Sequence, residues 1–212
     1  MKHGIKKTTI SKEILNKARV IYRNNESLLE QYIDLLLDKN HKINLVSRNV
    51  SRETVREHIV HSLLPLSMSL VKNHSKWIDS GTGGGIPGIP LAICNRNTEW
   101  QLNDNVRKKM RAVEDIIDSL QLNNTSTLAK SISLVDLEKG TGIATKHAFK
   151  IPDLLKLLGN KPWKTILMWK GAVDAEEEIR RSRKKLNCTL FEFDFGQDEP
   201  FYEGKALLLI ER

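Results

Sequence analysis

The sequence of 212 residues predicts an α/β protein with a mostly parallel, seven-stranded sheet and a helical extension at its N-terminus. Two observations predict this fold class. Strand-like and helix-like apolar periods alternate from Trp77 onward, which is typical of a parallel sheet covered by helices on both faces. The last two predicted strands are joined only by residues 196–204, so we expect an antiparallel hairpin at the sheet edge. The extension would cover residues 1–72 and the main domain residues 73–212.

The N-terminal third is predicted to be helical. Ser27-Leu28-Leu29-Glu30 has the spacing of a capping box, and apolar residues follow it at helical intervals, which predicts a helix over residues 28–39. Apolar residues recur every three or four positions from Val55, which predicts a second helix over residues 52–71.

The main domain shows strand and helix patterns in turn. The predicted strands cover residues 76–79, 100–104, 126–130, 141–146, 164–169, 188–195 and 205–211. The predicted helices cover residues 86–95, 106–121, 152–158 and 173–186.

Residues 76–91 have the pattern of a buried strand, a glycine loop and the start of a helix. Gly81, Gly83 and Gly85 lack a Cβ, so the loop can adopt positive φ and bring its N–H groups close to a ligand. The segment therefore predicts a nucleotide-binding loop.

Two ligands fit this loop. Residues 83–88 match Gly-x-Gly-x-x-Gly, and Asp104 lies where the dinucleotide fingerprint places its ribose-binding carboxylate, so an NAD-dependent dehydrogenase is one alternative. Against it, Asp79 puts a negative charge beside the expected pyrophosphate, and Pro87 removes an N–H from the helix start. S-adenosylmethionine fits better, because it carries an ammonium for Asp79 and has no phosphate.

The net charge of +8 is concentrated in three runs. Clustered cations favour a polyanionic partner, and none of the runs is a base-reading motif, so they predict phosphate contacts with nucleic acid. The runs are Lys2, Lys6, Lys7, Lys12, Lys17, Arg19 and Arg23; Arg107, Lys108, Lys109 and Arg111; and Arg180, Arg181, Arg183, Lys184 and Lys185.

Other features narrow the class of protein. Cys94 and Cys188 are far apart in apolar stretches, which predicts reduced core cysteines and a cytoplasmic location. No apolar leader and no run of about 18 apolar residues is present, so we expect no membrane partner. His58 and His61 lie one helical turn apart without further ligands at zinc spacing, and we expect no metal. We also expect a monomer.

The chain resembles the RsmG (GidB) family of bacterial 16S rRNA guanine-N7 methyltransferases. The resemblance runs from about residue 28 to the end. Its most specific part is the string from Ile78 to Leu91, whose paired prolines generic methyltransferase loops lack. It further rests on Asn40, Asn44-Leu45, Ser47, His58-Ile59, Ser62, Asp104, Lys108, Arg111, Ala148-Phe149 and Lys170-Gly171.

The resemblance implies a class I, Rossmann-like methyltransferase fold, S-adenosylmethionine as cofactor, and 16S rRNA or the small ribosomal subunit as partner. Cofactor contacts are expected from Asp79 at the methionine end, Asp104 at the ribose and the backbone of Ile132 and Ser133 at the adenine. His147 would contact RNA or the methionine carboxylate. The full expected cofactor set is Asp79, Gly81, Thr82, Gly83, Gly85, Ile86, Asp104, Ile132, Ser133 and His147. The expected RNA contacts are Lys108, Arg111, His147, Lys170, Arg180, Arg181 and Arg183.

No catalytic acid or base is expected, because guanine N7 carries an exposed lone pair and no proton. The chain departs from the family at polar positions: Ser131-Ile132-Ser133 replaces Arg-x-Glu, Gly142 replaces an Asp, and Lys146-His147 replaces Ser-Arg. The departures leave a second alternative open, a degenerate relative that binds cofactor or RNA without methyl transfer.

Overall fold

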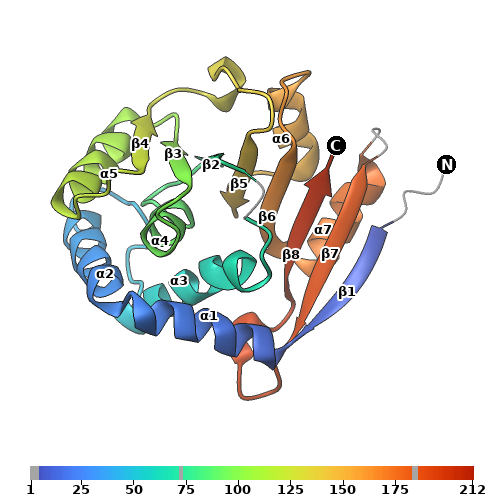
Figure 1. Cartoon of the computed structure of the whole chain (residues 1–212), viewed down its shortest axis with the longest axis horizontal. Coiled ribbons are helices and arrows are strands. Elements are labelled where there is room, and N and C mark those ends of the chain that lie inside the picture. The colour runs from blue at the N-terminus through green and yellow to red at the C-terminus, as the bar shows by residue number, and fades with distance from the viewer. Residues whose placement is uncertain (1–4, 72–73, 183–185) are drawn as a thin grey trace.

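The computed structural model describes residues 5–71, 74–182 and 186–212, and it contains one eight-stranded sheet in the order β1-β7-β8-β6-β5-β2-β3-β4. Strands β2 to β6 run parallel, and β8 runs antiparallel to both β6 and β7 (Figure 1). The strands are β1 Ile5–Ser11, β2 Lys76–Ser80, β3 Glu99–Asn103, β4 Thr125–Leu128, β5 Gly142–Lys146, β6 Thr165–Gly171, β7 Asn187–Asp194 and β8 Lys205–Glu211.

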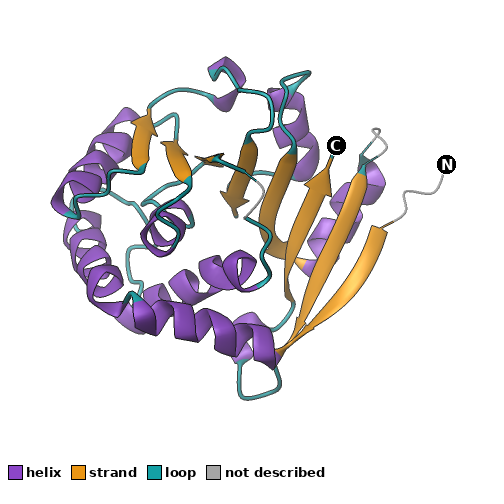
Figure 2. Ribbon diagram, in the orientation of Figure 1, coloured by secondary structure: helices purple, strands orange, loops and turns teal. Residues whose placement is uncertain are grey.

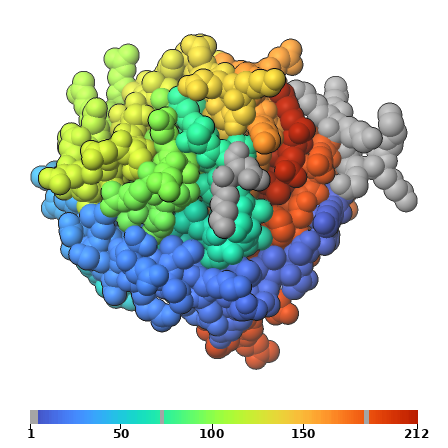
Figure 3. Space-filling model, in the orientation of Figure 1, coloured from blue at the N-terminus to red at the C-terminus, as the bar shows by residue number. Residues whose placement is uncertain are grey.

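Helices cover both faces of the sheet (Figure 2), and the sheet separates the core into two apolar clusters. One apolar cluster lies under α1 to α5, and the other lies under α6 and α7. The N-terminal helices form a continuous band, blue in Figure 3, along one side of the molecule. The helices are α1 Lys12–Asn24, α2 Glu26–Asn40, α3 Arg52–Ser67, α4 Gly88–Cys94, α5 Arg107–Ser119, α6 Ile151–Leu158 and α7 Ala172–Arg181, with short 3-10 turns η1 Ile132–Leu134 and η2 Pro200–Tyr202.

The predicted α/β fold with an antiparallel C-terminal hairpin is confirmed, but the sheet has eight strands instead of seven. The additional strand, β1, pairs in parallel with β7 from Ile5 opposite Cys188 to Ser11 opposite Asp194. Only Ile10 of β1 is buried, so the segment lacks the apolar alternation that marks a strand. The boundary at residue 72 stays a prediction.

Two details of the predicted helices are wrong. Ser27 does not cap a helix, because α2 begins at Glu26 and Glu30 accepts hydrogen bonds from Arg52 and Arg56 of α3. Helix α3 ends at Ser67, four residues earlier than predicted, and its cap is Ser51, whose hydroxyl accepts the N–H of Thr54 at 3.1 Å.

The tryptophans contribute to the core, and of the two cysteines Cys188 is buried and Cys94 is half-buried. All four tryptophans are buried, and Trp77 and Trp100 stack with ring centroids 5.7 Å apart. Both cysteines are free thiols. Within the described residues, no helix has the length and apolarity needed to cross a bilayer.

Candidate cofactor and RNA site

The loop between β2 and α4 closely approaches the end of β5. Gly81 and Gly83 have φ of +73° and +57°, a region that side chains with a Cβ rarely adopt. A Cβ on Gly81 would lie 2.4 Å from the Cβ of Ala148, just beyond β5. Glycine at this position therefore lets the loop and the end of β5 form one continuous surface.

The N–H groups of this loop are bonded within the protein. The carbonyl of Asn103, at the end of β3, accepts the N–H groups of Gly81 and Thr82 at 2.8 and 3.0 Å. The carboxylate of Asp104 accepts the N–H of Gly83 at 3.3 Å. The contact of these N–H groups with a ligand stays a prediction, because the structure shows them bonded to protein oxygens. A pyrophosphate would therefore find three successive donors already occupied.

Asp79 is fully buried beneath the loop. Its Oδ2 accepts hydrogen bonds from the Thr82 hydroxyl at 2.6 Å and from the Gly88 N–H at 2.8 Å. Its Oδ1 has no hydrogen-bond partner among the described residues. Burial raises the pKa of Asp79 to about 7, although both hydrogen bonds oppose the shift. The carboxylate fixes the loop from below, and its field favours a cationic ligand above the loop and disfavours a phosphate.

Two cavities meet above the glycine loop. The larger, of 530 Å³, lies between the end of β3 and η1, and the smaller, of 320 Å³, lies between the loop and α3. Both are lined by Gly81, Gly83 and Ala148. The larger cavity is also lined by Asn103, Asp104, Asn105, Val106, Lys109, Lys130, Ser131, Ile132, Phe149 and Leu157. The smaller is also lined by Leu45, Val46, Ser47, Val50, Val55, Thr82, Gly84, Ile86 and the side chains at its polar end, His58, Lys146 and His147.

Residues 45–50 form the outer wall of the smaller cavity. Asn40, at the end of α2, holds this wall: its Oδ1 accepts the N–H groups of Leu45 and Val46 at 2.9 and 3.0 Å, and its Nδ2 donates to the carbonyl of Ser47 at 3.2 Å. The carbonyl of Leu45 lies 3.1 Å from the position that a Cβ on Gly83 would occupy. This geometry explains why Asn40, Leu45 and Ser47 belong to one motif.

Sequence reasoning missed the cation of the smaller cavity, Lys146, which is half-buried at the end of β5. Its Nζ lies 2.8 Å from Nδ1 of His58, on α3. Burial, with a smaller effect from Lys205, lowers the pKa of Lys146 to about 7, while Asp79 opposes the shift. Burial and the Lys146 charge lower the pKa of His58 to about 3. Neutral His58 therefore accepts a hydrogen bond from the Lys146 ammonium.

His147 follows with φ of +57° and lines the same cavity. Partial loss of hydration, together with the charges of Lys146, Lys205 and Lys170, lowers its pKa to about 4. The side chain is therefore neutral at physiological pH, and it is not equivalent to the always-charged arginine of the family pattern.

The predicted cofactor residues divide into three groups. Seven of them line one or both cavities: Gly81, Thr82, Gly83, Ile86, Asp104, Ile132 and His147. Asp79 and Gly85 lie within the packed base of the loop and line neither cavity. Ser133 also lines neither cavity, whereas Ser131, two residues earlier, lines the larger one.

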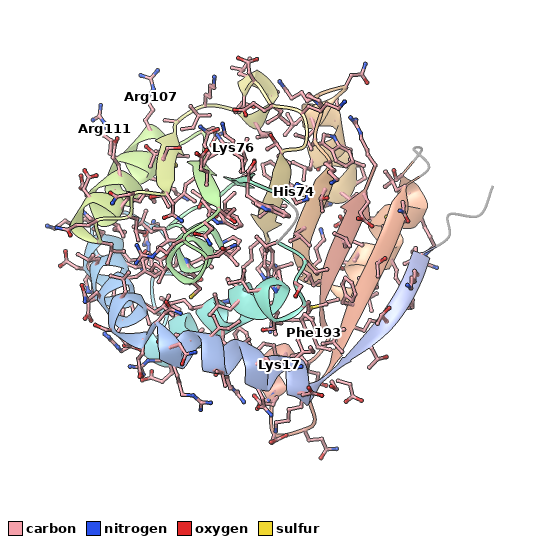
Figure 4. All side chains as sticks on the ribbon, in the orientation of Figure 1. Lys17, His74, Lys76, Arg107, Arg111 and Phe193 are labelled. Atoms are coloured by element: carbon pink, nitrogen blue, oxygen red, sulfur yellow. The ribbon has the colours of Figure 1, made fainter. Side chains whose placement is uncertain are left out.

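The predicted RNA contacts are spread over the molecule. Lys108 and Arg111 are exposed on α5 and form no ion pair with another described residue; Arg107 and Arg111 project outward from this helix (Figure 4). Lys109 of the same helix lines the larger cavity. This basic row, Arg107, Lys108 and Arg111, therefore borders the site.

Of the other predicted RNA contacts, His147 lines the smaller cavity, whereas Lys170, Arg180 and Arg181 line neither cavity. Lys170 donates to both carboxylate oxygens of Glu178 at 2.7 Å, and each side chain is less than one-sixth exposed. Arg180 and Arg181, on α7, pair with Glu176 and Glu177. Arg183 lies outside the described residues. Their contact with RNA stays a prediction.

Known proteins resemble this chain in fold and in sequence. A methyltransferase from Geobacter sulfurreducens superposes with a TM-score of 0.58 at 14% identity, covering 85% of this chain and 90% of that one. An O-methyltransferase from Bacillus cereus, solved in complex with SAH, gives a TM-score of 0.56 at 16% identity, covering 85% and 90%. These likenesses confirm the class I methyltransferase fold.

Curated relatives are closer in sequence. Ribosomal RNA small subunit methyltransferase G of Chlorobium limicola is 33% identical over 87% of this chain and 87% of its own length. The protein of the same name from Flavobacterium johnsoniae is 31% identical over 84% of this chain and 87% of its own. The family model GidB, rRNA small subunit methyltransferase G, matches residues 25–195. This chain therefore belongs to the GidB family.

Proposed function

We propose that the protein is an S-adenosylmethionine-dependent methyltransferase that modifies guanine N7 in the rRNA of the small ribosomal subunit. The observation that carries this proposal is the glycine loop itself. The N–H groups of Gly81, Thr82 and Gly83 are bonded to protein oxygens, and Asp79 is buried beneath them. Such a loop favours a cationic, phosphate-free nucleoside, and family membership supplies the rRNA substrate. It also disfavours the NAD-dependent dehydrogenase.

The residues present fit the cofactor. In this proposal the larger cavity holds adenosine, with Asp104 accepting from the ribose hydroxyls and Ile132 packing on the adenine. Gly81 and Gly83 let the ligand pass from the larger cavity into the smaller one, where the methionine end lies. S-adenosylmethionine supplies an electrophilic methyl group on its sulfonium. The aliphatic side chains of Leu45, Val46, Val50 and Val55 exclude water from the place of transfer.

The smaller cavity suits a reaction without a general base. Among the described residues its lining holds no carboxylate, and the pKa values of His58 and His147, about 3 and about 4, make both weak bases at neutral pH. Guanine N7 needs no deprotonation before it attacks the methyl group. Positioning of the base in line with the sulfonium is then sufficient for transfer.

We further propose that the RNA lies across the exposed row of α5, Arg107, Lys108 and Arg111, beside the larger cavity. The protein would act as a monomer in the cytoplasm on 16S rRNA or on the assembled small subunit. The departures from the family pattern do not remove the cofactor cradle, so cofactor binding is expected of an active enzyme and of a relative that binds without transfer, and only a transfer assay separates them.

The cofactor and the reaction can be tested together. Calorimetric titration should show binding of S-adenosylmethionine and S-adenosylhomocysteine and none of NAD. Incubation with labelled S-adenosylmethionine should transfer methyl groups to naked 16S rRNA or to small subunits, and borohydride with aniline should then cleave the product at 7-methylguanosine. Cofactor binding without transfer to either substrate would establish the degenerate relative, and NAD binding would overturn the assignment.

The RNA surface can be tested with two charge-matched variants. Lys108→Ala/Arg111→Ala and Arg180→Ala/Arg181→Ala each remove two cations, but only the second pair has glutamate partners. In the first variant the log–log slope of RNA affinity against salt should become shallower by about 1.5, because each phosphate contact contributes about 0.7 to 0.9. A larger change in the second variant would place the RNA on α7.

A further inference from the structure

The smaller cavity contains one cation whose hydrogen-bonding capacity is largely unused. The Lys146 ammonium has three donors, and His58 Nδ1 is the one acceptor that it contacts among the described residues. Its half-buried position shields it in part from water, and the resulting fall in its pKa indicates that the protein alone compensates the charge poorly. A ligand oxygen, above all a charged one, would complete this site.

The two cavities determine which end of the cofactor meets Lys146. Asp104 and Ile132 belong to the larger cavity, so the adenosine lies there, and the chain of the ligand must pass Gly81 and Gly83 into the smaller one. The amino-acid end of the ligand then lies in the cavity lined by Lys146. Its carboxylate needs a cationic partner once it is removed from water.

The neighbouring groups cannot supply that partner. His58 and His147 line the same cavity but are neutral, with pKa values near 3 and 4. Lys205, on β8, and Lys170, on β6, carry charge but line neither cavity, and Lys170 is paired with Glu178. Asp79 is buried in the base of the loop and lines neither cavity, and a negative charge there suits the ligand ammonium.

We propose that Lys146 binds the carboxylate of the cofactor and so supplies the positive charge that His147 cannot provide. This inference rests on the proposed function. The ammonium, fixed by His58 from α3, donates to the carboxylate, while the buried Asp79 attracts the adjacent ammonium of the ligand. Lys146 is thus a positioning residue: it fixes the amino-acid end and thereby the direction of the methyl group.

The test compares two ligands that differ in the amino-acid end. S-adenosylhomocysteine carries the carboxylate, and 5′-methylthioadenosine ends at the thioether. Calorimetry on Lys146→Met should show a loss of about ten- to a hundredfold in affinity for S-adenosylhomocysteine, as expected for a charged hydrogen bond, and less than a twofold change for 5′-methylthioadenosine. Lys146→Arg should retain part of the affinity. Lys150→Met, at an exposed lysine four residues later, is the matched control and should match the wild type for both ligands.

The other outcomes are distinguishable. Lys146→Met should remain folded, with a melting temperature no lower than that of the wild type, because it removes a poorly compensated, half-buried charge. Equal losses for both ligands would mean a general disturbance of the site and overturn the proposal. Unchanged affinity for S-adenosylhomocysteine with reduced methyl transfer would also overturn it and assign Lys146 to the RNA base. If wild-type protein binds neither ligand, the proposed function itself fails.

Discussion

Replacing Gly83 by alanine tests whether one ligand spans both cavities. Gly83 lines both of them, and an added Cβ would lie 3.1 Å from the carbonyl of Leu45. That carbonyl cannot easily retreat, because Asn40 bonds the N–H groups of Leu45 and Val46. The loop would therefore have to shift away from the carbonyl, and the shift would reduce the space that Gly83 leaves for a ligand crossing between the cavities.

The substitution should affect both the stability of the protein and its affinity for the ligand. At φ of +57° an alanine is strained by about 1 to 2 kcal/mol, which lowers the free energy of unfolding. Gly204 has a similar φ of +66°, but a Cβ there would meet no atom within 4 Å. Gly204→Ala therefore shares the backbone strain without the obstruction. Only Gly83→Ala should also lose affinity for S-adenosylhomocysteine, by at least about tenfold, or 1.4 kcal/mol.

Urea denaturation would measure the strain in both variants, and calorimetry would measure the affinity. The comparison between the two variants isolates the obstruction from the strain. An affinity of Gly83→Ala for S-adenosylhomocysteine within twofold of that of Gly204→Ala would refute the reasoning, because it would show that the ligand does not cross between the cavities along Gly83.

Three further predictions concern charge. Burial raises the pKa of Asp79 to about 7, so the native state binds a proton that the unfolded state releases near pH 4. The free energy of unfolding should therefore fall as the pH rises from about 4 to about 7. Urea titrations at pH 5 and 7.5 should show that this pH dependence is smaller in Asp79→Asn. With its pKa lowered to about 4, His147 is neutral at both pH 6 and pH 8. The cofactor affinity of the wild-type and His147→Ala proteins should therefore change by the same factor between these pH values. A larger change in the wild type would contradict the neutral state of His147. Lys170→Met leaves the largely buried Glu178 without its cation and should lower the free energy of unfolding by about 3 kcal/mol. The double variant Lys170→Met/Glu178→Gln should restore most of this loss. A loss below about 1 kcal/mol in Lys170→Met would show that the ion pair is not isolated from water.

The parts of the fold that were predictable are those that neighbouring residues determine. Strand β2, the glycine loop and the start of α4 follow from an apolar run, glycines at positive φ and Pro87 within a few positions of one another. Strand β1 was not predictable in this way, because its ladder partner β7 begins at Asn187 and only one residue of β1 is buried. Its formation depends on a surface that the rest of the chain must first build.

The same distinction applies to the site. Gly81, Gly83 and Asp104 could be identified because the loop and the following strand carry a local motif. Lys146 could not, because its environment depends on His58, which lies 88 positions earlier in the chain. The sequence shows a lysine at the end of a strand, and only the packing of α3 against that end makes it a half-buried cation.

The net charge shows how far pairing changes the meaning of a sequence pattern. Four described cations of the first basic run have carboxylate partners: Lys7 pairs with Glu176, Lys12 with Asp198, Lys17 with Glu13, and Arg19 with Glu199. The described arginines of the third run have glutamate partners as well.

On the other side, Lys109 and Lys130 line the larger cavity, and the exposed row of α5 continues beyond it. Paired surface charges attract a polyanion less than unpaired ones, so we expect the unpaired cations of α5 to contribute more to RNA binding than the paired ones. The runs in the sequence therefore predict a polyanionic partner, whereas the ion pairs of the folded chain decide which of the described cations stay available to bind it.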